Sequence, residues 1–82
     1  MLTLIYMQNT PAKTGNKYSN LVGKTKVLKS NTNIYAYKTM SGKFYSYLPN
    51  TRVRVLQDLG YINYIEVIAT KRRGYVYENV YK

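Results

Sequence analysis

The chain of 82 residues is long enough for one small domain, and the absence of cysteine and histidine excludes a disulfide, a thiolate nucleophile, the usual general base near neutral pH and the commonest zinc ligand. Only three carboxylates are present, Asp58, Glu66 and Glu78, and no catalytic motif surrounds them, so we expect no enzymatic activity, no metal and no cofactor. Thirteen lysines and arginines give a net charge of +10, which attracts anionic partners and also helps to keep a small protein in solution.

The first part of the chain predicts an arm rather than part of a folded domain. Residues 1–7 are apolar but too short to span a bilayer, and they lack a basic leader and a cleavage site. Residues 8–20 are polar and contain Pro11 and Gly15 without any periodicity, which is typical of a linker. We therefore expect an N-terminal arm and linker over residues 1–20, no secretion signal, no membrane span, and a cytoplasmic or virion-associated protein.

From residue 21 onward, short β-rich runs alternate with turn residues every eight to ten positions. The predicted strands cover residues 25–29, 34–38, 43–48, 52–57, 61–68 and 75–77, and residues 78–82 are expected to add one tight helical turn. No window has a helical period. The pattern predicts an all-β fold in which five to six short antiparallel strands form a small barrel over residues 21–82.

Alternation along each strand separates an apolar face from a face rich in tyrosine and basic residues. The apolar set is the predicted core and consists of Val27, Ile34, Phe44, Leu48, Val53, Val55, Ile65, Val67, Val76 and Val80. All eleven tyrosines fall outside this set. Because a tyrosine ring is flat and has a polar tip, a barrel with many tyrosines on its outer face is predicted to have an adhesive surface.

Six short motifs follow one another in a family-like order. They are Asn33-Ile34-Tyr35, Leu48-Pro49-Asn50-Thr51, Val53-Arg54-Val55, Tyr64-Ile65-Glu66-Val67, Gly74-Tyr75-Val76 and Asn79-Val80-Tyr81. Their order and spacing resemble the bacterial SH3 (SH3b) domain family over about residues 24–82. The chain departs from the family pattern at Tyr35, which replaces an arginine, and at Tyr64 and Tyr75, which replace tryptophans. The resemblance implies an SH3-like barrel.

The same resemblance implies a binding function. Domains of this family commonly bind cell-wall peptidoglycan or its peptide bridges, so we expect a cell-wall polymer or a protein as the partner. The candidate contact residues are tyrosines, whose rings give a large contact area at a low entropic cost: Tyr35, Tyr37, Tyr45, Tyr47, Tyr64 and Tyr75.

Two other functions remain open. A small phage-type virion or assembly protein would dock by its arm, with Leu2, Leu4, Ile5 and Tyr6 adding a strand to a neighbouring subunit in a larger assembly. A nucleic-acid-binding protein would stack bases on tyrosines and hold phosphates with basic side chains, for which the candidates are Arg52, Arg54, Lys71, Arg72 and Arg73. An ordinary solvated surface also accounts for these five basic residues.

Overall fold

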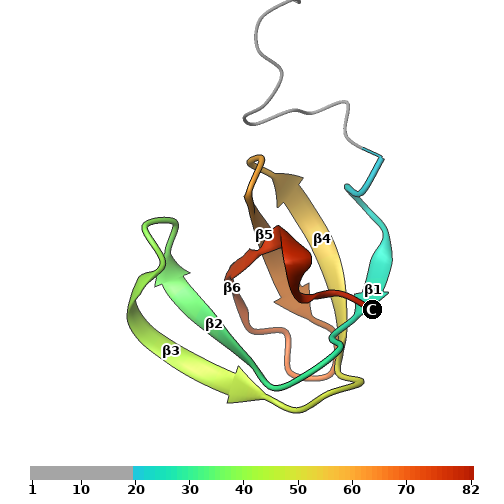
Figure 1. Cartoon of the computed structure of the whole chain (residues 1–82), viewed down its shortest axis with the longest axis horizontal. Coiled ribbons are helices and arrows are strands. Elements are labelled where there is room, and N and C mark those ends of the chain that lie inside the picture. The colour runs from blue at the N-terminus through green and yellow to red at the C-terminus, as the bar shows by residue number, and fades with distance from the viewer. Residues whose placement is uncertain (1–19) are drawn as a thin grey trace, which may run out of the picture.

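Residues 20–82 are described by the computed structural model, and their backbone forms one strongly curved antiparallel sheet (Figure 1). The strands are β1 (Thr25–Val27), β2 (Thr32–Tyr37), β3 (Ser41–Tyr47), β4 (Arg52–Asp58), β5 (Ile62–Val67) and β6 (Arg73–Tyr77), followed by the 3₁₀ helix η1 (Glu78–Val80). Their order across the sheet is β1-β4-β5-β6-β2-β3. The all-β prediction and all six predicted strands are confirmed, with bounds that agree to within two residues. The predicted arm, except for residue 20, lies outside the described residues.

Local chemistry explains where two of the turns between strands form. Asn50 has a φ of 73°, a left-handed conformation that asparagine tolerates better than most residues, and it follows Pro49 in the turn between β3 and β4. Between β4 and β5, the Gly60 N–H donates to Asp58 Oδ1 over 2.9 Å. This is the side-chain-to-backbone bond that makes aspartate common at the start of turns.

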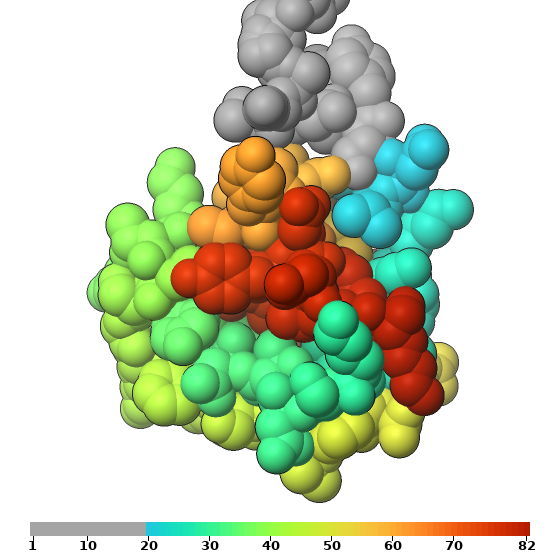
Figure 2. Space-filling view, viewed as in Figure 1, coloured from blue at the N-terminus to red at the C-terminus, as the bar shows by residue number. Residues whose placement is uncertain are grey.

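The C-terminal residues close the sheet at its β1 edge. Leu28, directly after β1, forms an antiparallel bridge with Tyr81, and the Lys82 N–H donates to the Val27 carbonyl oxygen over 2.8 Å. On its other side, the Leu28 N–H donates to the Thr51 carbonyl oxygen over 3.0 Å. The C-terminal segment therefore lies between β1 and the β2–β3 hairpin in the space-filling view (Figure 2), and the sheet becomes barrel-like.

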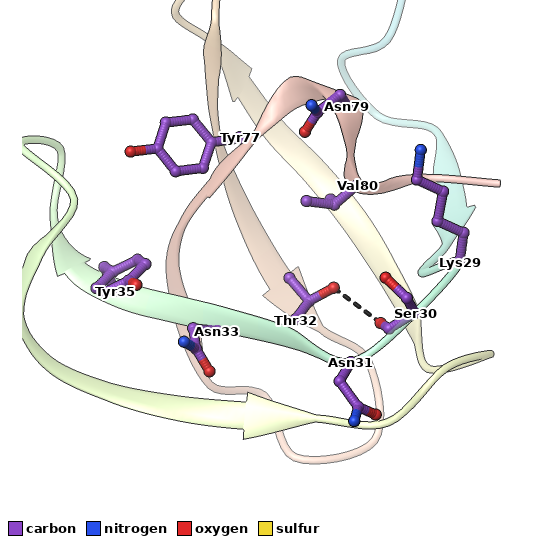
Figure 3. Close-up of a pocket in the computed structure, with 9 residues that line it drawn as sticks. All are labelled: Lys29, Ser30, Asn31, Thr32, Asn33, Tyr35, Tyr77, Asn79 and Val80. Carbon is purple, nitrogen blue, oxygen red and sulfur yellow. Dashed lines mark hydrogen bonds between the residues drawn. The ribbon is translucent and has the colours of Figure 1, made fainter.

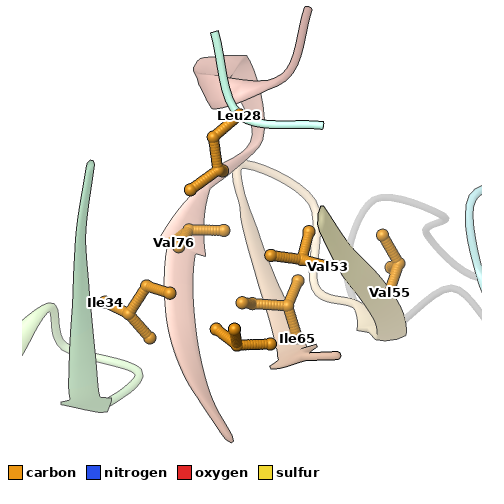
Figure 4. Packing of buried hydrophobic residues seen from close by; sticks show 7 residues of the cluster. Leu28, Ile34, Val53, Val55, Ile65 and Val76 are labelled. Carbon is orange, nitrogen blue, oxygen red and sulfur yellow. The ribbon is translucent and has the colours of Figure 1, made fainter. Parts of the chain in front are cut away.

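Seven apolar side chains fill the interior (Figure 4). They are Leu28, Ile34, Val53, Val55, Ile65, Val67 and Val76, and all except Leu28 were predicted from the sequence. Val80 is partly buried and packs against this core, as expected.

Three predicted core residues lie elsewhere. Val27 pairs with Arg52 on the outer face of the sheet, so Leu28 takes the core position instead. Phe44 is 49% exposed and Leu48 is 70% exposed. In β3 the partner of the buried Ile34 is Tyr45, and partners in an antiparallel pair share a face. In β3 the side that includes Tyr45 and Tyr47 therefore faces inward, whereas the sequence predicted the side that includes Phe44.

A polar cluster is buried at one end of the barrel. The Asn63 side chain is fully buried, its amide donates to Asp58 Oδ1 over 3.2 Å, and its carbonyl oxygen accepts the Tyr81 hydroxyl over 2.8 Å. Asn63 lies on the core side because it shares the buried face of β5 with Ile65, and Tyr64 between them points to the other face. These bonds satisfy polar atoms that would otherwise be costly to bury.

The same cluster makes the free energy of unfolding depend on pH in the alkaline range. Burial raises the pKa of the Tyr81 hydroxyl above its ordinary value of 10.0, and the nearby charges of Asp58 and Glu78 raise this pKa further. The folded state thus holds this proton more tightly than the unfolded state does, and the resulting stabilisation is complete below the unfolded pKa of about 10. It is lost as pH rises through the higher folded-state pKa.

We therefore expect the free energy of unfolding to fall more steeply above about pH 10 in the natural chain than in Tyr81→Phe. Urea titrations of both proteins at about pH 8 and about pH 11 measure the difference, and their common lysines and remaining tyrosines serve as an internal control. Equal losses in the two proteins would contradict this expectation.

Candidate functional site

Four aromatic rings form one row across the outer face of the sheet. Tyr35 in β2 pairs with Phe44 in β3 on one side and with Tyr75 in β6 on the other, and Tyr75 pairs with Tyr64 in β5. The ring centroids are 5.6 Å apart for Tyr35 and Phe44 and 4.7 Å apart for Tyr64 and Tyr75. We call these four residues the aromatic row. It exists because directly paired residues in antiparallel strands point to the same face.

The six predicted tyrosines do not form one surface. Three of them belong to the aromatic row, and Tyr37 lies at the end of β2 with 62% of its surface exposed. Tyr45 and Tyr47 point to the opposite side of β3. There the Arg72 guanidinium lies 3.8 Å from the centroid of the Tyr45 ring, and Tyr47 packs against the core.

A pocket of about 290 Å³ lies beside the row at Tyr35, where β2 diverges from β6 (Figure 3). Its lining consists of Lys29, Ser30, Asn31, Thr32, Asn33, Tyr35, Tyr77, Asn79 and Val80. Tyr35 belongs to both the pocket and the aromatic row. Amide and hydroxyl groups dominate the polar lining, and Lys29 is the one charged residue among the lining residues.

Hydrogen bonds hold part of this lining in place. The Thr32 hydroxyl donates to the Ser30 carbonyl oxygen over 2.9 Å, and the Ser46 hydroxyl donates to Asn33 Oδ1 over 2.6 Å. Sequence reasoning interpreted residues 30–33 only as a turn, and it did not include Tyr77 or Asn79. The asparagine-rich turn was the available signal, but the pocket forms only when this turn meets η1 in space.

The structure brings only some of the five predicted polyanion contacts together: Arg54 and Arg73 lie on the same face, on either side of Glu66. Arg52 and Arg54 are exposed on the outer face of β4, whereas Arg73 forms an ion pair with Glu66 over 3.5 Å. Arg72 stacks on Tyr45 as described above, and Lys71 sits in the β5–β6 turn. One basic patch made of all five residues is therefore not present. The four candidate docking residues of the arm, Leu2, Leu4, Ile5 and Tyr6, lie outside the described residues.

The remaining features of residues 20–82 are few. A second pocket of about 250 Å³ is lined by Lys38, Leu59, Tyr61 and Ile62. In the described part of the chain, no three potential metal-ligating side chains come together, and none of the helical structure there has the length and hydrophobicity to cross a membrane. No protein-family model, curated protein or solved structure matches this chain.

Proposed function

We propose that this domain is a non-catalytic binding module that recognises a cell-wall polymer, through the sugar units or the peptide bridges of that polymer. The observation that supports the proposal is the amide- and hydroxyl-lined pocket, whose lining includes Tyr77 and also Tyr35 of the aromatic row. The resemblance of residues 24–82 to bacterial SH3 domains points to the same class of ligand.

The chemistry of the pocket suits a neutral polar ligand. Asparagine side chains both donate and accept hydrogen bonds, as sugar hydroxyls, acetamido groups and peptide units require. Tyrosine rings on two sides of the pocket offer flat apolar contact with little loss of side-chain entropy. At about 290 Å³ the pocket is at the small end of ligand sites, so it matches one unit of a polymer rather than a large ligand.

The aromatic row extends this site. Neighbouring strands in a sheet lie about 4.8 Å apart, so the four strands of the row span about 14 Å. A polymer with one unit in the pocket therefore has room to place its next units against Tyr35, Phe44 and Tyr75.

Co-sedimentation with washed bacterial cell walls tests the proposal. Tyr77→Ala and Asn33→Ala are expected to weaken pelleting by about tenfold, because truncating a central contact typically costs 1–2 kcal/mol or more. Tyr61→Ala is the matched control, since Tyr61 is 76% exposed and does not line this pocket. Absence of pelleting with every wall type, or an equal loss in Tyr61→Ala, would refute the proposal.

Single-stranded nucleic acid is the second candidate ligand, and the aromatic row is the observation that favours it. Aromatic residues on a sheet can stack successive bases, each contributing about 1–3 kcal/mol. Phosphate contacts make such binding fall steeply as salt rises, whereas binding to a neutral unit in the pocket does not depend strongly on salt. Titration with single-stranded DNA at low and moderate salt therefore separates the two ligands.

A role in virion assembly rests on residues outside the described part of the chain and stays a prediction. It requires that a chain without residues 1–20 keeps its barrel but no longer enters a larger assembly.

A further inference from the structure

The two edge strands of the sheet, β1 and β3, differ in how their outer backbone groups are paired. At β1, the C-terminal segment adds the Leu28–Tyr81 bridge and its backbone hydrogen bonds. At the other edge, β3 pairs with β2 alone among residues 20–82, and Figure 1 shows it on the outside of the molecule. In an antiparallel pair, backbone N–H and C=O groups that do not face the partner strand point outward. Strand β3 thus presents outward hydrogen-bonding groups in regular alternation over Phe44–Tyr47, and a register shift interrupts the alternation towards Ser41.

The side chains of β3 are accessible on both faces of the sheet. All of its residues except the last, Tyr47, are classed as exposed. Phe44 lies on the outer face beside Tyr35, and Tyr45 lies on the opposite face beneath Arg72. An additional strand would therefore meet an aromatic ring on each of its faces, which is the arrangement that gives cross-strand pairs their stability.

Charge at this edge is of one sign. The hairpin formed by β2 and β3 carries Lys38 and Lys43, and Arg72 reaches it by stacking on Tyr45. The three acidic residues of the whole chain are Asp58, Glu66 and Glu78, so none is in this hairpin, and Glu66 is already paired with Arg73. The cations near β3 have no acidic partner within the hairpin.

We infer that β3 is a docking edge for an extended acidic peptide, which adds to the sheet as a further strand. Backbone hydrogen bonds to β3 supply the affinity in this mode of recognition, and alternate side chains supply the specificity. Acidic side chains of the peptide face Lys43 and Arg72, and apolar ones face Phe44 and Tyr35. A second copy of this chain is disfavoured as the occupant, because each copy has a net charge of +10 and brings its own Lys43 to the edge.

The probe is a capped heptapeptide that alternates glutamate and valine, labelled for fluorescence anisotropy, with a lysine–valine heptapeptide as the charge control. Two further probes carry N-methyl groups on all glutamates or on all valines. Since only alternate N–H groups of an added strand face β3, one N-methylated set is expected to abolish binding and the other to preserve it. Amide hydrogen exchange of residues 41–47 should slow when the unmodified acidic peptide is bound.

Matched variants test the charge argument. Lys43→Glu is expected to weaken binding of the acidic peptide by at least about tenfold, whereas Arg52→Glu, an equal charge change on β4, should leave it within about twofold. Tyr77→Ala should also leave it unchanged, so failure of this inference is distinguishable from failure of the proposed wall-binding function.

Several outcomes would overturn the inference. Equal binding of both N-methylated peptides, equal binding of the lysine peptide, or an equal loss in Arg52→Glu would indicate diffuse attraction. Slow exchange, without peptide, of those amides of residues 41–47 that do not face β2 would show that the edge is already occupied, by a second copy if light scattering detects a dimer and by the chain's own arm if it detects a monomer.

Discussion

Gly74→Ala is expected to lower the free energy of unfolding by about 3 kcal/mol, at the upper end of the usual cost of overpacking. A Cβ atom at this position would lie 2.5 Å from Ile34 Cγ2 and 2.6 Å from the Tyr35 carbonyl oxygen. Ile34 is part of the filled core, and Tyr35 is the residue through which β2 pairs with Tyr75. Neither neighbour can move away without disturbing the core or separating the β2–β3 hairpin from β6.

Gly23→Ala provides the contrast for this experiment. Gly23 has a φ of +89°, and an added Cβ would meet nothing within 4 Å, so the substitution introduces backbone strain without a clash. A left-handed conformation costs a residue with a Cβ about 1–2 kcal/mol. Urea denaturation followed by circular dichroism compares the two variants. If Gly74→Ala lowers the free energy of unfolding by no more than Gly23→Ala does, the close approach of β2 to β6 does not require a glycine at position 74.

Asn63→Leu is expected to destabilise the protein by about 3 kcal/mol despite the similar size of the two side chains. The Tyr81 hydroxyl would lose its acceptor, and Asp58 Oδ1 would lose one of its two donors. A buried polar group that loses its partner typically costs 1–3 kcal/mol, and here two groups are affected.

The double variant Asn63→Leu with Tyr81→Phe separates the two costs. Because it also removes the hydroxyl left without an acceptor, we expect it to regain part of the stability lost in Asn63→Leu, which a thermal or urea unfolding series would measure. Destabilisation that is simply additive in the double variant would contradict a bonded Asn63–Tyr81 pair.

Most of the strand pattern was predictable because buried and exposed residues alternate strictly in the middle of the sheet. Val53 and Val55 in β4 and Ile65 and Val67 in β5 are each separated by one outward-facing residue, and all four are buried as predicted. That pattern specifies a face without reference to any other strand.

The phase of β3 was not predictable in this way. Phe44 and Tyr45 are both aromatic, so the local sequence does not indicate which of them faces the core. The pairing of Tyr45 with Ile34 decides the matter. That register depends on the hairpin turn and on the register shift in β3, where two residues, Gly42 and Lys43, lie opposite the single β2 residue between Tyr35 and Tyr37.

In the candidate site, too, some features could be predicted from the sequence and others could not. Tyr35, Tyr64 and Tyr75 each adjoin a core residue, so their placement on the outer face could be predicted. The pocket could not, because residues 29–35 and 77–80 form it jointly and neither segment carries its signature alone.

The bridge between Leu28 and Tyr81 also has a kinetic consequence. It joins the residue directly after the first strand to one beyond the last strand, so barrel closure depends on some of the most sequence-distant contacts in residues 20–82. Small β-proteins dominated by such contacts fold in milliseconds to seconds rather than microseconds. Until closure, the backbone groups of Val27 and Leu28 that later pair with Lys82 and Tyr81 are open to other chains. During synthesis on a ribosome, this interval lasts at least until both residues have left the exit tunnel.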